Sequence, residues 1–406
     1  MIQTEQPDTV NQLPVPDKAA AEHSQRVKQC VVDKITAVGN LPFTDYMQTV
    51  LYEPGLGYYS AGSIKLGAEG DFITAPEISA LFSQSLAQAI IPALDVIDHA
   101  CILEVGAGSG KMAADMLPHL DSLNSLPSRY YILELSADLR LRQQQYIKEK
   151  VPALYDRVCW LDELPTQLNA VVIANELLDA MPVVRFKKEQ QGISLEYVTV
   201  VDNKFHSQFI QDESDVLYQR ASARVAQMES DGLVLELGYI SEINFNAEDW
   251  LSSVADRLEQ GVIVLIDYGY PQHEYYHAER NEGTLNCFYR HRQHSNPFIY
   301  PGLQDLTAHI NFTALADCAI KNKLNVKGYT SQSNFLLGAG IASLVEVVAA
   351  EYIDKNNIAA QMELANQVKK LTMPYEMGEL VKVIGFSKNC QVEFAAFHFK
   401  DMRDHL

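Results

Sequence analysis

Three glycines alternate in a short run that directly follows an apolar segment. Residues 102–111 read ILEVGAGSGK, in which Gly106, Gly108 and Gly110 come after the apolar stretch. Glycines at such a place let a strand turn sharply into a helix and let a ligand approach bare backbone. The run therefore predicts a ligand-binding loop, with an ordinary structural turn as the alternative.

The neighbours of these glycines exclude two phosphate-binding loops. A dinucleotide fingerprint needs Gly or Ala where Lys111 stands, and a P-loop needs Gly at Val105 and Ser or Thr at Met112. The remaining pattern, E-x-G-x-G-x-G, begins at Glu104 and is typical of loops that bind S-adenosyl-L-methionine (SAM), which has no phosphate. We therefore expect Glu104 and the three glycines to bind SAM.

Acidic residues also follow the next two apolar runs. Glu134 lies at the end of the second run, 24 residues after Gly110, where a carboxylate can accept hydrogen bonds from both ribose hydroxyls. Trp160 and Asp162 end the third run and suit adenine, through stacking and through its exocyclic amine. The alternatives are that Glu134 caps the following helix and that Trp160 is an ordinary buried residue.

The fourth apolar run ends in the acidic segment NELLDAMP, residues 175–182. Methyl transfer from a sulfonium requires an aligned nucleophile and exclusion of water. A guanidinium, whose pKa exceeds about 12, is a poor nucleophile, but carboxylates can orient it and stabilise its growing charge. We expect Glu176 and Asp179 to do this. The alternative is that both are acids at the N-terminus of a helix, favoured by its dipole.

Five apolar runs alternate with helical patterns and predict a parallel sheet covered on both faces. The runs are 101–105, 130–135, 158–161, 170–174 and 262–266. Residues 183–210 alternate as antiparallel strands do, and 380–385 with 392–399 are predicted to complete a seven-stranded sheet. The predicted divisions are a disordered tail (1–20), a cap over the cofactor site (21–98), a SAM-binding core (99–282), an inserted, mainly helical substrate-side domain (283–376) and terminal strands (377–406).

Composition limits the partners and the location. Of 406 residues, 32 are Lys or Arg and 52 are Asp or Glu, so the net charge of −20 argues against nucleic acid and favours cationic partners. Six scattered cysteines without a CxxC pair, and an Arg- and His-rich segment at 290–294 without zinc spacing, predict neither disulfides nor a metal site. No uninterrupted apolar run approaches about 18 residues, so no membrane span is predicted. The polar, acidic start of the chain predicts a cytoplasmic location.

Six segments occur in an order that closely resembles the MidA-like SAM-dependent methyltransferases, over roughly residues 40–400. They are GDFITAPEIS (70–79), EVGAGSG (104–110), NELLDAMP (175–182), IDYGYP (266–271), GTL…YRHR (283–292) and TSQSNFLLGAGI (330–341). The resemblance implies an α/β fold, a class I methyltransferase with a Rossmann-like sheet, and ω-N methylation of a protein arginine. The family includes a mitochondrial arginine methyltransferase that assists assembly of respiratory complex I.

The resemblance also implies roles for individual residues. Asp71, Thr74, Pro76 and Glu77 would form a loop that closes over the methionine end of SAM. Asn175, with Glu176, would face the reacting centre. The family commonly has His where this chain has Leu161, which puts a polar contact to adenine from that position in question.

The sequence therefore predicts a SAM-dependent N-methyltransferase whose substrate is a protein arginine. Glu176 would orient the guanidinium, assisted by Asp179 or Asp71. The protein substrate could be a subunit of a respiratory complex. A methyltransferase for a small molecule and an assembly or adaptor factor that binds SAM only structurally remain alternatives, and a nicotinamide enzyme is disfavoured by Lys111.

Overall fold

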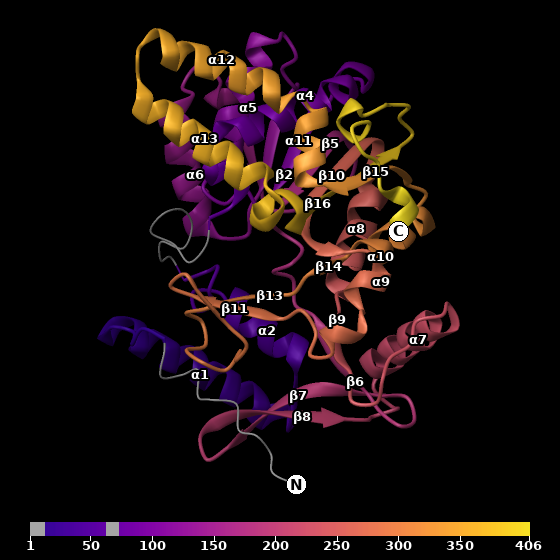
Figure 1. The fold of residues 1–406 in the computed structure, drawn as a ribbon. Coiled ribbons are helices and arrows are strands. Elements are labelled where there is room, and N and C mark those ends of the chain that lie inside the picture. Colours follow the sequence, from indigo (N-terminus) through magenta and orange to yellow (C-terminus); the bar gives the residue numbers. More distant parts are fainter. Residues whose placement is uncertain (1–12, 62–72) are drawn as a thin grey trace. The chain divides into compact units, whose positions relative to one another are not determined.

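Residues 13–61 and 73–406, which this computed structural model describes, belong to two compact units (Figure 1). The sheet unit comprises Ile73–Asp179, Asn246–Tyr275 and His309–Leu406. The antiparallel unit comprises the chain up to Phe72, Ala180–Phe245 and Tyr276–Ala308.

The sheet unit contains the five predicted parallel strands. They are β2 (Cys101–Val105), β3 (Tyr130–Leu133), β4 (Val158–Leu161), β5 (Leu168–Asn175) and β10 (Leu258–Tyr270). Neighbours pair in parallel in the order β10-β5-β2-β3-β4. Two antiparallel strands, β16 (Val381–Lys388) and β15 (Asn325–Ser331), extend the sheet beyond β10, and the short β14 (Ile310–Asn311) also pairs with β10. This confirms the α/β, Rossmann-like fold.

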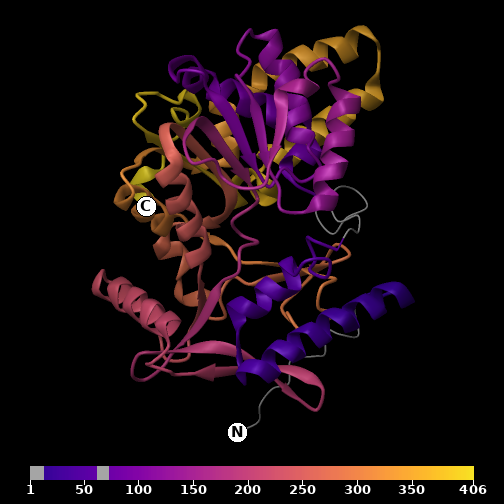
Figure 2. The ribbon, with the colours of Figure 1, turned by 180° about the vertical axis from the view of Figure 1, so that it is seen from behind.

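The helices of this unit cover strands that are apolar on both sides, as in β2, where every residue is buried (Figure 2). Buried side chains of three helices, α4 (Ala80–Val96), α5 (Lys111–Ser122) and α6 (Ala137–Lys150), belong to one core with the strands. The remaining helices are α3 (Ala75–Ile78), α8 (Phe245–Arg257, whose first residue belongs to the antiparallel unit), α9 (Gln272–Tyr275), α10 (Phe312–Lys321), α11 (Gln332–Gly338), α12 (Ile341–Asp354) and α13 (Ile358–Thr372).

The strand order creates a switch point between β2 and β5. From β2 the chain crosses to β3 and then to β4, and it returns to the other side of β2 to form β5. Open α/β sheets bind ligands outside the carboxyl ends of two such strands, because the connections leave them in opposite directions. The glycine loop follows β2 and the acidic turn follows β5, so the fold brings both to this point.

The predicted strand at 392–399 is wrong. This segment forms a short 3₁₀ helix, Ala395–Phe397. Its apolar pattern reflects single side chains that pack on the sheet: a Cβ at Gly328 would lie 2.1 Å from the ring of Phe397. The strand that pairs with β16 is β15, which lies inside the segment predicted to be an insert.

Four predicted divisions also need correction. The predicted cap (21–98) and the predicted core (99–282) are each divided between the two units, since the chain up to Phe72 and Ala180–Phe245 belong to the antiparallel unit. The insert predicted over 283–376 is divided, since 283–308 belong to the antiparallel unit and form strands, whereas 309–376 belong to the sheet unit. The predicted tail ends early, because helix α1 (Lys18–Val38) begins where the side chain of Asp17 accepts a hydrogen bond from Ala20 N at 2.9 Å.

The antiparallel unit confirms the predicted excursion at 183–210. Its first sheet contains β1 (Leu41–Pro42), β6 (Val184–Lys188), β7 (Ile193–Val201), β8 (Lys204–Ile210) and β9 (Ile240–Ile243), and its second contains β11 (Asn286–Tyr289), β12 (Arg292–His294) and β13 (Asp305–Thr307). Helices α1, α2 (Phe43–Tyr52) and α7 (Val216–Ser230) complete the unit.

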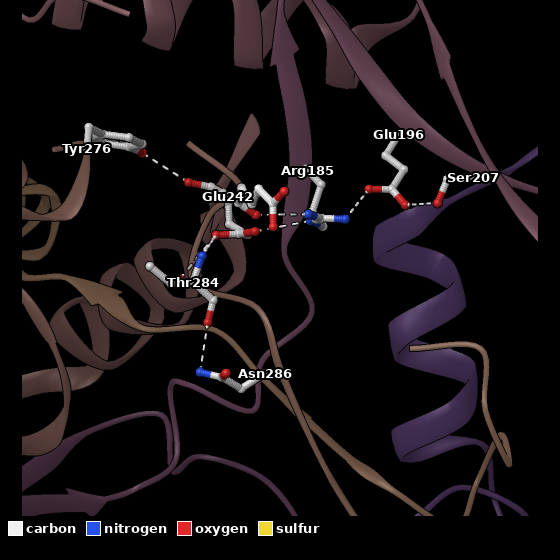
Figure 3. A network of polar contacts seen from close by, with 8 residues as sticks. Arg185, Glu196, Ser207, Glu242, Tyr276, Thr284 and Asn286 are labelled. Carbon is white, nitrogen blue, oxygen red and sulfur yellow. Dashed lines mark hydrogen bonds and ion pairs between the residues drawn. The ribbon is translucent and has the colours of Figure 1, made fainter. Parts of the chain in front are cut away.

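A buried ion network joins the strands of this unit (Figure 3). Arg185 of β6 lies between Glu196 of β7 and Glu242 of β9, and its Nε is 3.1 Å from Glu242 Oε1. Thr284 donates two hydrogen bonds to Glu242 Oε2, from its backbone N at 2.7 Å and from Oγ1 at 3.1 Å. Buried charges are stable only when they are paired and hydrogen-bonded, so this network fixes the start of segment 284–289.

Thr284→Val is expected to destabilise this segment by about 1–3 kcal/mol, because a buried carboxylate loses a hydrogen bond. Hydrogen exchange of the amides of residues 284–289 measures the effect. Thr284→Ser keeps the hydroxyl and should stay close to the unmodified chain. Equal exchange in all three proteins would contradict the prediction.

Among the described residues, no single helix is both long and apolar enough to cross a membrane. One pair, Gln332–Gly338 with Ile341–Asp354, meets the length and composition criteria together, and it is bent by 72°.

Candidate functional site

The glycine loop after β2 adopts a conformation that requires its glycines. Gly106, Gly108 and Gly110 have φ values of 71°, 55° and 83°, in the left-handed region that other residues rarely adopt. A Cβ at Gly106 would lie 2.8 Å from Leu177 Cδ1, and one at Gly110 would lie 3.2 Å from Ile147 Cδ1. The loop therefore packs closely against the acidic turn and against α6.

Glu104 lies in the core beneath this loop. It is only 2% exposed and accepts a hydrogen bond from the Tyr130 hydroxyl at 2.7 Å. Burial raises the pKa of Glu104 to about 7, against the effect of the Tyr130 hydrogen bond, which lowers it. This hydrogen bond thus links β2 to β3 inside the core.

Glu134 directly follows β3, and its carboxylate accepts hydrogen bonds from two donors. Its Oε1 accepts from Ser136 N at 2.9 Å, and its Oε2 accepts from Gln143 Nε2 at 3.0 Å. Burial is the main cause that raises its pKa. Ser136 is the N-cap residue of α6, so the capping alternative describes part of what Glu134 does.

Sequence reasoning missed Gln143, which is fully buried in α6. Its Nε2 also donates to Gly108 O at 3.0 Å, and its Oε1 accepts from Trp160 Nε1 at 3.0 Å. The signal in the sequence was its position four residues before Ile147, which places both on one face of the helix. One amide thereby contacts the turns after β2 and β3 and the end of β4.

The end of β4 is more exposed to solvent than the sequence suggested. The side chain of Asp162 is 89% exposed and pairs with Arg140 Nη1 at 2.7 Å. Beside Glu134, Leu135 is 84% exposed. An exposed leucine next to a half-buried carboxylate offers a bound ligand an apolar surface and a hydrogen-bonding partner within one turn.

The short segment before α4 connects the glycine loop with the acidic turn. Thr74 precedes α3, Pro76 is buried, and Glu77 accepts a hydrogen bond from the hydroxyl of Ser109 in the glycine loop. Ala75 N donates to Glu176 Oε1 at 3.2 Å. Asp71, the further residue predicted here, lies outside the described residues.

Glu176 has a strained backbone. Its φ is 48°, a left-handed value uncommon for a residue other than glycine, and its N donates to Ile266 O at 2.8 Å. Such strain costs about 1–3 kcal/mol and concentrates at functional sites. Beside it, Asn175 donates to Glu176 Oε1 at 3.3 Å, while the buried Asn175 Oδ1 accepts no hydrogen bond from the described residues.

The helix alternative for the acidic turn is wrong, because the residues between β5 and β6 form turns rather than a helix. The fully buried Asp267 holds this turn in place of a helix. Its Oδ2 accepts from Leu178 N at 2.8 Å and from Asp179 N at 3.3 Å, and its Oδ1 accepts from Tyr268 N at 2.8 Å. Sequence reasoning had included this residue only within the segment IDYGYP (266–271) and had not predicted its contacts with the acidic turn.

Asp267→Asn is expected to flatten the dependence of stability on pH. Burial raises the pKa of Asp267 from 3.8 to about 7, so in this range the folded chain keeps a proton that the unfolded chain has lost. This group therefore makes the free energy of unfolding fall as pH rises from about 4 to about 7. Thermal unfolding between pH 4 and pH 8 measures the slope.

Asp162→Asn is the matched control, since this carboxylate is exposed. It should leave the slope as it is. A slope in Asp267→Asn equal to that of the unmodified chain would contradict the assignment.

These residues fit SAM. The loop exposes backbone where any Cβ would crowd its neighbours, Glu134 is an acceptor at the end of the adjacent strand, and Asn175 Oδ1 has hydrogen-bonding capacity to spare. In the part of the chain that the structure describes, no three His, Cys, Asp or Glu side chains gather where they could hold a metal ion.

Comparisons with known proteins identify the family and the cofactor. A family of S-adenosyl-L-methionine-dependent methyltransferases matches residues 85–330. A protein from Burkholderia thailandensis, crystallised with S-adenosyl-homocysteine, is 39% identical, with a TM-score of 0.90 and coverage of 97% of this chain and 100% of that one. The predicted fold, cofactor and methyltransferase activity are confirmed.

Curated relatives correct the predicted location. The human protein arginine methyltransferase NDUFAF7, mitochondrial, is 27% identical over 85% of this chain and 80% of its own length. The Drosophila melanogaster homologue, also named mitochondrial, is 26% identical over 90% of this chain and 86% of its own length. The prediction of a cytoplasmic location is therefore contradicted. Because the family match covers more than half of the chain and the Burkholderia protein aligns over 97% of it, the chain belongs to this family of SAM-dependent methyltransferases.

Proposed function

We propose that this chain transfers a methyl group from SAM to a guanidinium nitrogen of a protein arginine. The observation that supports this most directly is the conformation of Glu176 at the switch point of the sheet. Ala75 N and Ile266 O hold it beside the glycine loop. Two relatives that align over most of the chain are named protein arginine methyltransferases.

The geometry of the turns supports the proposed cofactor roles. Gly106, Gly108 and Gly110 would present backbone to the amino-acid end of SAM, and Glu134 would accept hydrogen bonds from the ribose. Leu135 and Asp162 lie at the adenine side, where Asp162 would first have to leave Arg140. When bound, SAM supplies an electrophilic methyl group on its sulfonium sulfur.

The segment at the methionine end has its own role. Thr74, Pro76 and Glu77 would lie over this end of the cofactor. The contact between Glu77 and Ser109 holds the segment on the glycine loop.

Acceptor binding depends on the acidic turn. The Glu176 carboxylate would orient the guanidinium by accepting its N–H groups and would stabilise the positive charge that grows on it as the methyl group leaves the sulfur of SAM. S-adenosyl-homocysteine is the leaving group, and the methylated nitrogen loses one proton to solvent. Asn175 and Asp179 complete the polar surface of the turn, and Asp267 keeps the backbone of Asp179 in place. Burial raises the pKa of the Tyr268 hydroxyl, and the charges of Glu176 and Asp179 add to this effect. An aromatic ring near these acids would favour a cationic acceptor.

We further propose a subunit of a respiratory complex as the protein substrate. The support for this is the resemblance of the six sequence segments to a family with a member that assists respiratory complex I.

The test uses SAM with a labelled methyl group. The purified protein is incubated with labelled SAM and an extract from cells that do not make this protein. Mass spectrometry then locates the label. We expect methylarginine in a protein, and none when Glu176→Gln replaces the unmodified chain. Label confined to small molecules would favour a small-molecule methyltransferase. Bound SAM without any transfer, in a chain that still binds its partner, would favour the adaptor alternative.

A further inference from the structure

The amide of Gln143 links three turns of the cofactor site, although it belongs to none of them. Gln143 lies in the middle of α6 and is fully buried. It contacts Gly108 O, Glu134 Oε2 and Trp160 Nε1, each at 3.0 Å. These partners come from the glycine loop, the end of β3 and the end of β4.

The chemistry of the partners fixes the orientation of this amide. The carbonyl oxygen of Gly108 and the carboxylate of Glu134 only accept hydrogen bonds, so both must face the two N–H groups of Gln143. The indole nitrogen of Trp160 only donates, so it must face the amide oxygen. A flipped amide would lose all three hydrogen bonds, which leaves one arrangement for the whole group.

We infer that Gln143 is a positioning residue that couples occupancy of the cofactor site to the environment of the Trp160 indole. The inference rests on the proposed role of Glu134 as the ribose ligand. A ligand that hydrogen-bonds Glu134, or that lies against Gly108, acts on the two acceptors that hold the Gln143 N–H groups. Any shift of the amide then reaches the indole through Oε1, because the amide group is planar and its nitrogen and oxygen move together.

The indole gives a direct readout. The chain has two tryptophans, Trp160 and Trp250. Trp250→Phe leaves Trp160 as the single indole, and S-adenosyl-homocysteine is titrated while its emission is recorded. We expect the emission to change and to saturate with the same Kd as calorimetry gives.

Gln143→Met tests the link with a side chain of similar size that makes none of the three hydrogen bonds. We expect a loss of affinity for S-adenosyl-homocysteine of about 10- to 100-fold, the effect of losing hydrogen bonds to a charged group. The emission response should disappear. Gln145→Met is the matched control, because Gln145 lies on the exposed side of the same helix, and it should leave both quantities unchanged.

Gln143→Glu separates positioning from simple packing. The new carboxylate keeps the shape but faces Glu134 and Gly108 O, two acceptors. The other charged groups near Glu134 are Arg140 of α6, which lowers its pKa, and Glu104 of β2, whose own pKa it raises. Two carboxylates in contact share a proton as pH falls. That proton restores one donor, so affinity should be weak at pH 8 and recover towards pH 6, which Gln143→Met should not show.

The outcomes separate the inference from the proposed function. If the unmodified chain binds no S-adenosyl-homocysteine in calorimetry, the proposed function itself fails. If it binds but Gln143→Met and Gln145→Met have equal affinity and equal emission, the coupling inference is wrong. If circular dichroism shows that Gln143→Met does not fold, Gln143→Glu decides between the outcomes. Recovery of the affinity for S-adenosyl-homocysteine at low pH supports the positioning role, and an affinity independent of pH overturns the inference.

Discussion

Glu176→Gln is expected to slow methyl transfer about 10²- to 10³-fold while leaving the affinity for S-adenosyl-homocysteine unchanged. The amide retains an oxygen that can accept from Ala75 N, now at 3.2 Å from Glu176 Oε1, so the turn should keep its shape. What it loses is the negative charge opposite the guanidinium, whose positive charge grows in the transition state. An effect on rate without an effect on cofactor binding is therefore expected.

Single-turnover kinetics with labelled SAM measure the rate, and calorimetry measures the affinity. Glu346→Gln makes the same chemical change on the exposed side of α12 and should be neutral. If Glu176→Gln transferred methyl groups within threefold of the unmodified rate, the carboxylate would not be the acceptor-binding group. A loss of affinity equal to the loss of rate would assign Glu176 to the cofactor instead.

Gly106→Val is expected to weaken binding of S-adenosyl-homocysteine by at least about 100-fold. At φ 71° a β-branched residue is strained, and its Cβ would lie 2.8 Å from Leu177 Cδ1. Leu177 can move, but the methyl groups of valine would then stand where the ligand must meet bare backbone. Loss of contact over the amino-acid end of the ligand accounts for the size of the effect.

Gly232→Val controls for the backbone strain alone. Gly232 has φ 99°, and a Cβ there would meet no atom within 4 Å. This variant should be destabilised without any change in affinity, as calorimetry with circular dichroism can check. Binding by Gly106→Val within threefold of the unmodified chain would contradict the placement of the cofactor on this loop.

Where prediction from the sequence failed, the cause was pairing at long range. The pattern of Val392, Phe394 and Phe397 reads as a strand, yet these buried side chains fill space over a sheet edge that β15 already occupies. Whether such a segment pairs as a strand or packs its side chains on the sheet depends on which distant segment occupies the sheet edge. Local periodicity does not determine this. The contacts of Gln143 and Asp267 were missed for the same reason, since most of their partners are remote in the sequence.

The sequence by itself determined the five parallel strands, because strands buried on both faces must be continuously apolar. It also determined the glycine loop and the positions of Glu134 and Glu176, because a turn at the end of a strand can be read from its own residues. Only the tertiary structure decided that Glu104 lies in the core, that Asp162 pairs with Arg140, and that segment 283–376 is divided between two units. The physical reason is that residue type and spacing set local conformation, whereas burial and pairing depend on neighbours that only the folded chain brings together.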